Sequence, residues 1–322
     1  MEACPPATLR WEVSDGAAST CRFRGMCGIL PQATHKRRGS LQRFCIGLVA
    51  RRDSNISTMR LIPYALTDVG RKRQHNEDSY LISQDQDLFA VADGMGGHRA
   101  GEKASRMAIE RLRESLVSPR KNATRDEVLG HLQRAMTITG AAIFDAAQSD
   151  PNLAGMGTTL TSVLFHGTRA YVAHVGDSRA YLYRDGRVQQ ITHDHSWVAE
   201  QVKAGLLTEQ EAKESRFRHI ITRSVGFERE VQVDGTICPV QAGDCLFLCS
   251  DGLSNYMEES DFSEILTQYS YREVPQMLVG LANARGGDDN ITVVLVHIAN
   301  DYSTSLDLAQ RPGGVVTIGG QS

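Results

Sequence analysis

The stretch Leu88-Phe-Ala-Val-Ala-Asp93-Gly-Met-Gly-Gly-His98 joins an apolar run to an aspartate and a cluster of glycines. The run Leu88–Ala92 predicts a buried strand that ends at Asp93. A helical pattern follows, with apolar residues at every fourth position: Ala104, Ala108, Leu112 and Leu116. Four glycines in the eight residues after Asp93 let the backbone approach a ligand closely. Because an Asp-Gly pair after a strand is more often an ordinary turn, its meaning depends on the other aspartates.

Three further aspartates stand in comparable positions. Asp251 follows the apolar run Leu246–Ser250, Asp289 directly precedes a strand predicted at Ile291–Ile298, and Asp78 opens an earlier strand. Mg²⁺ and Mn²⁺ prefer carboxylate, carbonyl and water oxygens. Carboxylates that converge from separate strands would make such a site, and two ions sharing one carboxylate can clamp an in-line phosphoryl displacement.

Outward from this stretch, strand and helix patterns occur in blocks. Strands are predicted at 61–67, 79–82, 88–92, 158–165, 169–175, 180–183, 188–192, 231–238, 245–250 and 291–298. Helices are predicted at 101–116, 125–147, 261–269 and 274–284, and the polar segment 196–218 also reads as helical. Paired helices between hairpin-linked strands favour an α+β fold with antiparallel sheets and argue against a doubly wound parallel sheet.

The composition is that of a soluble globular protein, with 41% hydrophobic and 23% charged residues. The first 58 residues hold nine Lys/Arg and four Asp/Glu, a net charge of +5, which leaves −8 of the total −3 for the rest. This acidic body argues against a nucleic-acid partner. Seven cysteines without a C-x-x-C pair favour reduced thiols and a cytoplasmic location over a zinc site. We expect no membrane segment, because no apolar run approaches the roughly 18 residues that a span needs.

Three regions are expected along the chain. Residues 1–58 read as a basic, disordered leader, or as an over-extended start with Met59 as the initiator. Residues 59–300 carry the globular pattern and form the expected catalytic domain. Residues 301–322 contain Gly, Ser and Gln and are expected to be a flexible tail.

Seven segments in order resemble the motifs of the metal-dependent protein phosphatases of type 2C, in the bacterial variant. They are Thr67–Asp78, Val91–His98, Gly155–Thr159, Val175–Arg179, Ile221–Gly226, Leu248–Leu253 and Asp288–Val293. One such motif would be weak support, whereas seven at the family's spacing across residues 61–298 are specific to it.

The resemblance implies an αββα four-layer sandwich: two antiparallel sheets packed face to face, flanked by helices. It also implies two Mn²⁺ or Mg²⁺ ions with a possible weaker third. The implied metal ligands are Asp93, the carbonyl of Gly94, Asp251, Asp289, Asp78 through water, and Asp177 for the third ion. Glu77 would also hold metal-bound water, and Arg73 would grip the phosphate, since a guanidinium binds phosphate oxygens bidentately.

Two positions depart from the family pattern. Some members have a histidine two residues after the bridging aspartate, assigned as general acid, where this chain has Met95. The proton would then come from His98, His75 or a metal-bound water. Asn255 stands where members often carry a further aspartate for the third metal, so that ion should bind more weakly.

The implied activity is hydrolysis of phosphoserine and phosphothreonine in proteins by a metal-bridging hydroxide, opposing a serine/threonine kinase, by a monomeric enzyme. The segment 196–226 is a candidate flap in which Arg216 and Arg218 could select acidic phosphopeptides. Two alternatives remain: a catalytically dead relative that binds phosphoproteins as a scaffold, and a two-metal nuclease. Intact Arg73, Asp93, Asp251 and Asp289 disfavour the scaffold, and the acidic body disfavours the nuclease.

Overall fold

The computed structural model describes residues 59–96, 99–300 and 316–319. The predicted leader 1–58 and most of the predicted tail therefore lie outside the described residues, as do Gly97 and His98. No helix among the described residues is long and apolar enough to cross a membrane.

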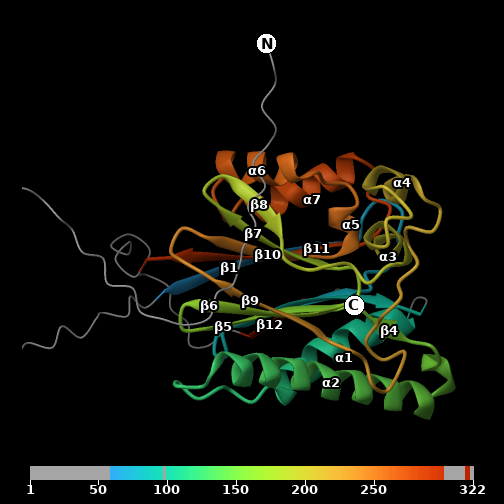
Figure 1. Ribbon diagram of the computed structural model, residues 1–322. Coiled ribbons are helices and arrows are strands. Elements are labelled where there is room, and N and C mark those ends of the chain that lie inside the picture. Colours follow the sequence, from blue (N-terminus) through green and yellow to red (C-terminus); the bar gives the residue numbers. More distant parts are fainter. Residues whose placement is uncertain (1–58, 97–98, 301–315, 320–322) are drawn as a thin grey trace, which may run out of the picture. The chain divides into compact units, whose positions relative to one another are not determined.

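Two antiparallel sheets lie face to face between two layers of helices (Figure 1). The first sheet has the order β1 (Arg60–Asp68), β11 (Ile291–Ala299), β10 (Cys245–Cys249), β7 (Arg179–Arg184) and β8 (Arg187–Gln190). The second has the order β12 (Val316–Gly319), β2 (Asp78–Ser83), β3 (Leu88–Met95), β5 (Leu160–His166), β6 (Arg169–Val175) and β9 (Asp234–Pro239), with β4 (Gly157–Thr158) paired to β3. The expected four-layer αββα sandwich is confirmed.

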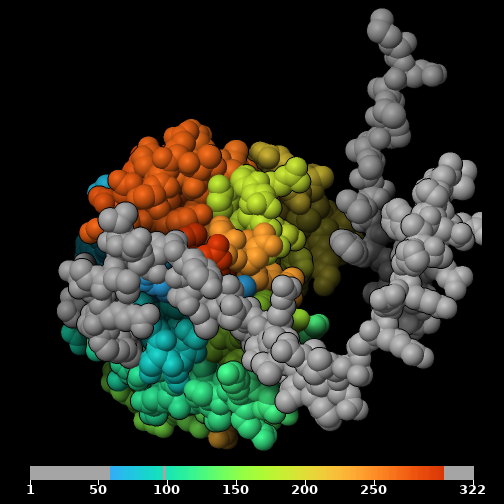
Figure 2. Space-filling view, turned by 90° about the vertical axis from the view of Figure 1, so that its left-hand side faces the viewer, coloured from blue at the N-terminus to red at the C-terminus, as the bar shows by residue number. Residues whose placement is uncertain are grey.

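Helices cover the outer face of each sheet. The second sheet is covered by α1 (Arg99–Ser115) and α2 (Arg125–Ser149), after which comes the 3₁₀ turn η1 (Pro151–Leu153). The first sheet is covered by α5 (Asp251–Ser254), α6 (Glu259–Gln268) and α7 (Val274–Ala284). Figure 2 shows the same order from the side, with the orange residues of α6 and α7 at one end and the green residues of α1 and α2 at the other.

Period-two alternation explains why the strands read as continuous apolar runs. In β3, Leu88 and Ala90 face the helices while Phe89 and Val91 face the opposite sheet. In β11, Val293 and Leu295 face the helices, and Val294 and Val296 enter the core between the sheets. Both faces of each sheet are therefore buried, which removes the polar half of the usual antiparallel pattern.

The structure differs from the expected elements in several places, and two of these differences have a clear local cause. The segment 196–218 forms two short helices, α3 (Trp197–Lys203) and α4 (Glu209–Glu214), in place of one. Gly205 between them has φ +71°, a conformation that ends a helix and that glycine adopts without strain. Within the predicted tail, the backbone of β12 pairs with β2, because that strand's free edge offers unpaired groups.

Candidate metal centre

The predicted site residues come together where strand ends of both sheets meet. Asp78 opens β2 and is the direct cross-strand neighbour of Asp93 in β3. In the other sheet, the end of β10 lies beside the start of β11, which places Asp251 near Asp289. Asp177 follows β6, and its carboxyl group is close enough to feel the charge of Asp251.

Asp78 is held by one of its two oxygens. Its Oδ2 accepts hydrogen bonds from the hydroxyls of Thr292, at 2.6 Å, and Ser250, at 2.8 Å. The residue is only 1% exposed, and Oδ1 has no hydrogen-bonding partner among the described residues. Burial raises the pKa of Asp78, the two hydroxyls oppose that shift, and the charges of Asp251 and Asp289 add to it.

Asp93 is fixed through its backbone. Its N–H donates to Thr159 Oγ1 at 2.9 Å, and its carbonyl accepts from the N–H of Thr159 and the hydroxyl of Thr158. The carboxyl group of Asp93 lies close enough to those of Asp78 and Asp251 to feel their charges. Desolvation raises the pKa of Asp93 well above its ordinary value, and the charges of Asp78 and Asp251 raise it further.

Gly94 is required by a close approach of three backbone segments. A Cβ at this position would lie 2.0 Å from the carbonyl oxygen of Gly101 in α1 and 2.7 Å from that of Glu77. Gly101 is equally constrained, since a Cβ there would lie 1.9 Å from Glu77 Oε2. The glycines after Asp93 thus bring the start of α1 and the Glu77 carboxylate against the end of β3.

Arg73 and Asp289 form an ion pair at the open side of the site. Arg73 Nη2 lies 2.8 Å from Asp289 Oδ2, and the side chains are 50% and 36% exposed. Asp251 is partly buried, and Asn255 Nδ2 donates to its Oδ2 at 3.1 Å. Burial raises the pKa of Asp251, and so does the charge of Asp289.

Asp177 is buried, at 7% exposure, and its Oδ1 also has no hydrogen-bonding partner within the described chain. Burial raises its pKa well above the ordinary value, as do the charges of Asp251 and Asp194. Asp194 is itself held by Arg179, whose Nη2 lies 2.7 Å from Asp194 Oδ2.

These donors suit a hard divalent cation. They are all oxygens, and buried Oδ1 atoms of Asp78, Asp177 and Asp251 have no hydrogen-bonding partner in the described part of the chain. Among the described residues, no group of three or more His, Cys, Asp or Glu side chains is already placed to hold a metal ion. Ions such as Mg²⁺ keep several water ligands and take few carboxylates each.

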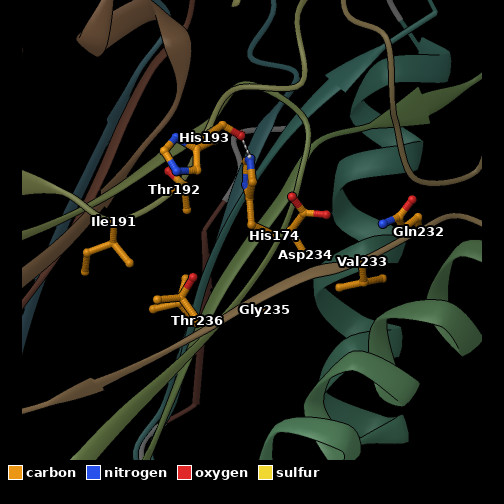
Figure 3. Close-up of a pocket in the computed structure, with 10 residues that line it drawn as sticks. His174, Ile191, Thr192, His193, Gln232, Val233, Asp234, Gly235 and Thr236 are labelled. Carbon is orange, nitrogen blue, oxygen red and sulfur yellow. Dashed lines mark hydrogen bonds between the residues drawn. The ribbon is translucent and has the colours of Figure 1, made fainter. Parts of the chain in front are cut away.

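A separate cavity of about 380 Å³ lies between β6, β9 and the segment after β8 (Figure 3). His174 points into it, and its Nε2 is 3.2 Å from the carbonyl oxygen of His193. None of the described residues that line this cavity is a predicted site residue.

Comparison with known proteins decides the family. The model of the family described as Protein phosphatase 2C matches residues 69–279, more than half of the chain. This chain belongs to the protein phosphatase 2C family. The membership rules against the nuclease alternative.

Relatives of this phosphatase come from several bacteria. It is 39% identical over 234 residues to the serine/threonine phosphatase stp of Listeria innocua, covering 71% of this chain and 93% of that protein. The crystal structure of the Mycobacterium tuberculosis serine/threonine phosphatase PstP/Ppp matches with a TM-score of 0.69 and 38% identity, covering 74% of this chain and 99% of that one. A second PstP structure, of the catalytic domain in complex with two manganese ions, matches with a TM-score of 0.67, 38% identity and coverage of 76% and 100%.

Sequence reasoning missed the residues that orient this phosphatase 2C site. Ser250, Thr292 and Thr159 are buried and hold Asp78 and the backbone of Asp93, yet none of the three was predicted as a site residue. All three stood inside quoted motifs, and that position was the available signal.

The two departures from the family pattern keep their importance. Met95 lies in β3 and pairs with Gly157, and its thioether cannot donate a proton. Of the proposed donors, His98 lies outside the described residues and His75 is exposed. Asn255 is exposed beside Asp251.

Proposed function

We propose that this chain is a Mn²⁺- or Mg²⁺-dependent phosphatase of phosphoserine and phosphothreonine in proteins, with its centre at the strand ends that carry Asp78, Asp93 and Asp251. The observation that carries the proposal is the crowding of these carboxylates. Burial and then their mutual repulsion raise their pKa values, while buried oxygens have no hydrogen-bonding partner among the described residues. Divalent cations would relieve that repulsion. The family membership and the manganese-bound relative support the same reading.

We propose for these residues the ligand roles that the family resemblance implies. Asp93 would be shared between two ions, and the carbonyl of Gly94 would serve the first of them. Asp251 and Asp289 would complete the second, and Asp177 would serve a weaker third. Asp78 and Glu77 would hold water in the first coordination shell; Asp78 is suited to this because Ser250 and Thr292 leave only its Oδ1 available.

When bound, the ions would activate a water for attack on phosphorus and offset the charge that develops on phosphate. Arg73 would bind the non-bridging phosphate oxygens, because its half-exposed guanidinium stands at the open side of the site. Protonation of the leaving oxygen has no donor at Met95, so we propose His75, His98 or water for that role.

The substrates are phosphorylated proteins. We propose that they are products of a serine/threonine kinase, that the enzyme acts as a monomer, and that it works in the cytoplasm. The proposed cytoplasmic location rests on Cys245 and Cys249, which are buried and keep free thiols without forming a disulfide.

The test is hydrolysis of a phosphothreonine peptide in Mn²⁺ and in chelator. We expect activity that requires the cation and falls at least about 100-fold in Asp251→Asn, because a neutral amide is a weaker ligand. Asp145→Asn, an exposed aspartate on α2 paired with Arg229, is the matched control and should keep wild-type activity.

Equal hydrolysis in chelator and in Mn²⁺ would contradict the proposal. Tight binding of the phosphopeptide without turnover in Mn²⁺ would favour the scaffold alternative.

A further inference from the structure

The loop Val69–Glu77 carries Arg73 and lies directly against the segment that leads into β11. The N–H of Arg71 donates to the carbonyl of Gly287 at 2.6 Å. Gly70 has φ +81°, and a Cβ there would lie 2.2 Å from the carbonyl oxygen of Asp289. The position of Arg73 relative to Asp289 therefore depends on how this loop packs against the segment before β11.

One buried side chain in that segment is bonded to the loop at three points. Asn290 is 4% exposed, and its Nδ2 donates to the carbonyls of Val69, at 3.0 Å, and His75, at 2.9 Å. Its Oδ1 accepts the N–H of Glu77 at 2.8 Å. Two carbonyls need donors and one N–H needs an acceptor, so the chemistry of the partners fixes the orientation of the amide.

The same residue also holds the partner of Arg73. The backbone N–H of Asn290 donates to Asp289 Oδ1 at 2.8 Å, while Arg73 Nη2 donates to Asp289 Oδ2 at 2.8 Å. Asn290 thus connects both ends of the loop, through Val69 and Glu77, to the carboxylate that the loop's arginine contacts.

We infer that Asn290 is a positioning residue that sets Arg73 for phosphate binding by clamping the loop Val69–Glu77 onto Asp289. The inference rests on the proposed function, in which Arg73 binds phosphate. It assigns to the amide a role that aspartate cannot fill, since a carboxylate has no N–H for the two carbonyls. Its loss should weaken phosphate binding more than metal binding.

The experiment is a double-mutant cycle with Asn290→Ala and Arg73→Ala in the Mn²⁺-loaded enzyme, using an aryl phosphate as substrate. We expect Asn290→Ala to lower kcat/KM about 10- to 100-fold, as loss of a supporting residue commonly does. The KM and the inhibition constant of inorganic phosphate should both rise. In the Arg73→Ala background the same change should alter kcat/KM less than about twofold, because the residues then act as one unit.

Calorimetric titration with Mn²⁺ distinguishes a specific loss of phosphate binding from a general destabilisation of the enzyme. The Mn²⁺ affinity of Asn290→Ala should stay close to that of wild type, because the hydrogen bond from Asn290 to Asp289 comes from the backbone N–H, which alanine retains. Thr139→Ala is the matched control: Thr139 is fully buried on α2, bonds the carbonyl of Ala135, and should lose stability without a change in phosphate inhibition.

Multiplicative effects of the two substitutions would overturn the inference, as would a loss of Mn²⁺ affinity equal to the loss of kcat/KM. Asn290→Ser is a second variant with a smaller loss of polar surface. If both Asn290 variants fail to fold, Asn290 is a folding residue and the inference is wrong. Absence of Mn²⁺-dependent hydrolysis in the wild type would instead overturn the proposed function.

Discussion

At the scale of single residues, neighbouring side chains bond some carboxylate oxygens of the site and leave others without a hydrogen-bonding partner among the described residues. Asp78 has one oxygen saturated by Ser250 and Thr292, and the other is buried without a hydrogen bond. A buried carboxylate oxygen left in this state costs free energy. Under the proposed function, a bound cation would offset that cost at Asp78.

His174 provides a pH-dependent stability prediction. Burial, followed by the charge of nearby His195, lowers the pKa of His174 to about 3, so its neutral form is the folded one. The unfolded chain takes up a proton below about pH 6.5, which favours unfolding as the pH falls toward the folded value. Wild type should therefore lose about 2 kcal/mol from this group between pH 7 and pH 5.

Chemical denaturation at the two pH values checks this against His174→Gln. The aspartates with raised pKa shift stability in the opposite direction in both proteins, so the difference between the two curves isolates the histidine. Parallel pH dependences of wild type and variant would show that His174 contributes nothing.

At the scale of elements, the segment between β8 and β9 is held more by local contacts and is more exposed than the strands of the sandwich. Each of its short helices has a local N-terminal cap, Ser196 for α3 and Thr208 for α4. No residue of α4 is buried, and Phe217 and Ile220 beyond it are 37% and 47% exposed. Few buried contacts hold this segment, so it can open at lower free energy than the sheets.

Arg218 in this segment lies close enough to Asp288, the neighbour of Asp289, for the two charges to interact. Its charge contributes to the lowered pKa of Asp288, after the larger effects of Lys72 and Tyr256. We predict that Arg218→Ala raises the KM for an acidic phosphopeptide about two- to fivefold, the range of one exposed charge pair. Hydrolysis of a small aryl phosphate should not change.

Steady-state kinetics with acidic and neutral phosphopeptides of equal length measures this selectivity. Lys213→Ala is the control, because Lys213 lies in the same segment but pairs with Glu258, 2.9 Å away. An equal change of KM for both peptides in Arg218→Ala would show that the arginine does not read substrate charge.

At the scale of the whole molecule, stability and function oppose each other at one end of the sandwich. Carboxylates from both sheets converge there, and their pKa values rise first because they are buried and then because each destabilises the charge of the others. The apolar core between the sheets sustains this arrangement, since it holds the strand ends together regardless of their charge.

Cation binding should therefore raise the melting temperature. Ligand at about 100 times its dissociation constant adds about 2.7 kcal/mol of stability, which corresponds to roughly 5–10 °C in a domain of this size. Thermal melts in Mn²⁺ and in chelator measure the shift, and it should be clearly smaller in Asp251→Asn. An unchanged melting temperature in Mn²⁺, or the same shift in the variant, would contradict metal binding at these aspartates.

The amino-acid sequence by itself determined the apolar strands and the paired helices, and it supplied the residues proposed for the site. These depend on local patterns: apolar runs at Leu88–Ala92 and Ile291–Ile298, glycines after Asp93, and carboxylates at strand ends. Even there, the break at Gly205 and the pairing of β12 escaped prediction, since each depends on a turn or an available sheet edge.

Only the tertiary structure decided which groups support the site. Asn290 and the loop around Arg73 are separated by more than 200 residues, as are Thr292 and Asp78, and no local pattern links them. Sequence periodicity indicates which face of an element is buried. A hydrogen bond between distant segments depends instead on the register of the sheet and on how the loops pack. The sequence thus shows which positions carry aspartates, and the tertiary structure determines which of their carboxylate oxygens are left without a hydrogen bond and can bind a ligand.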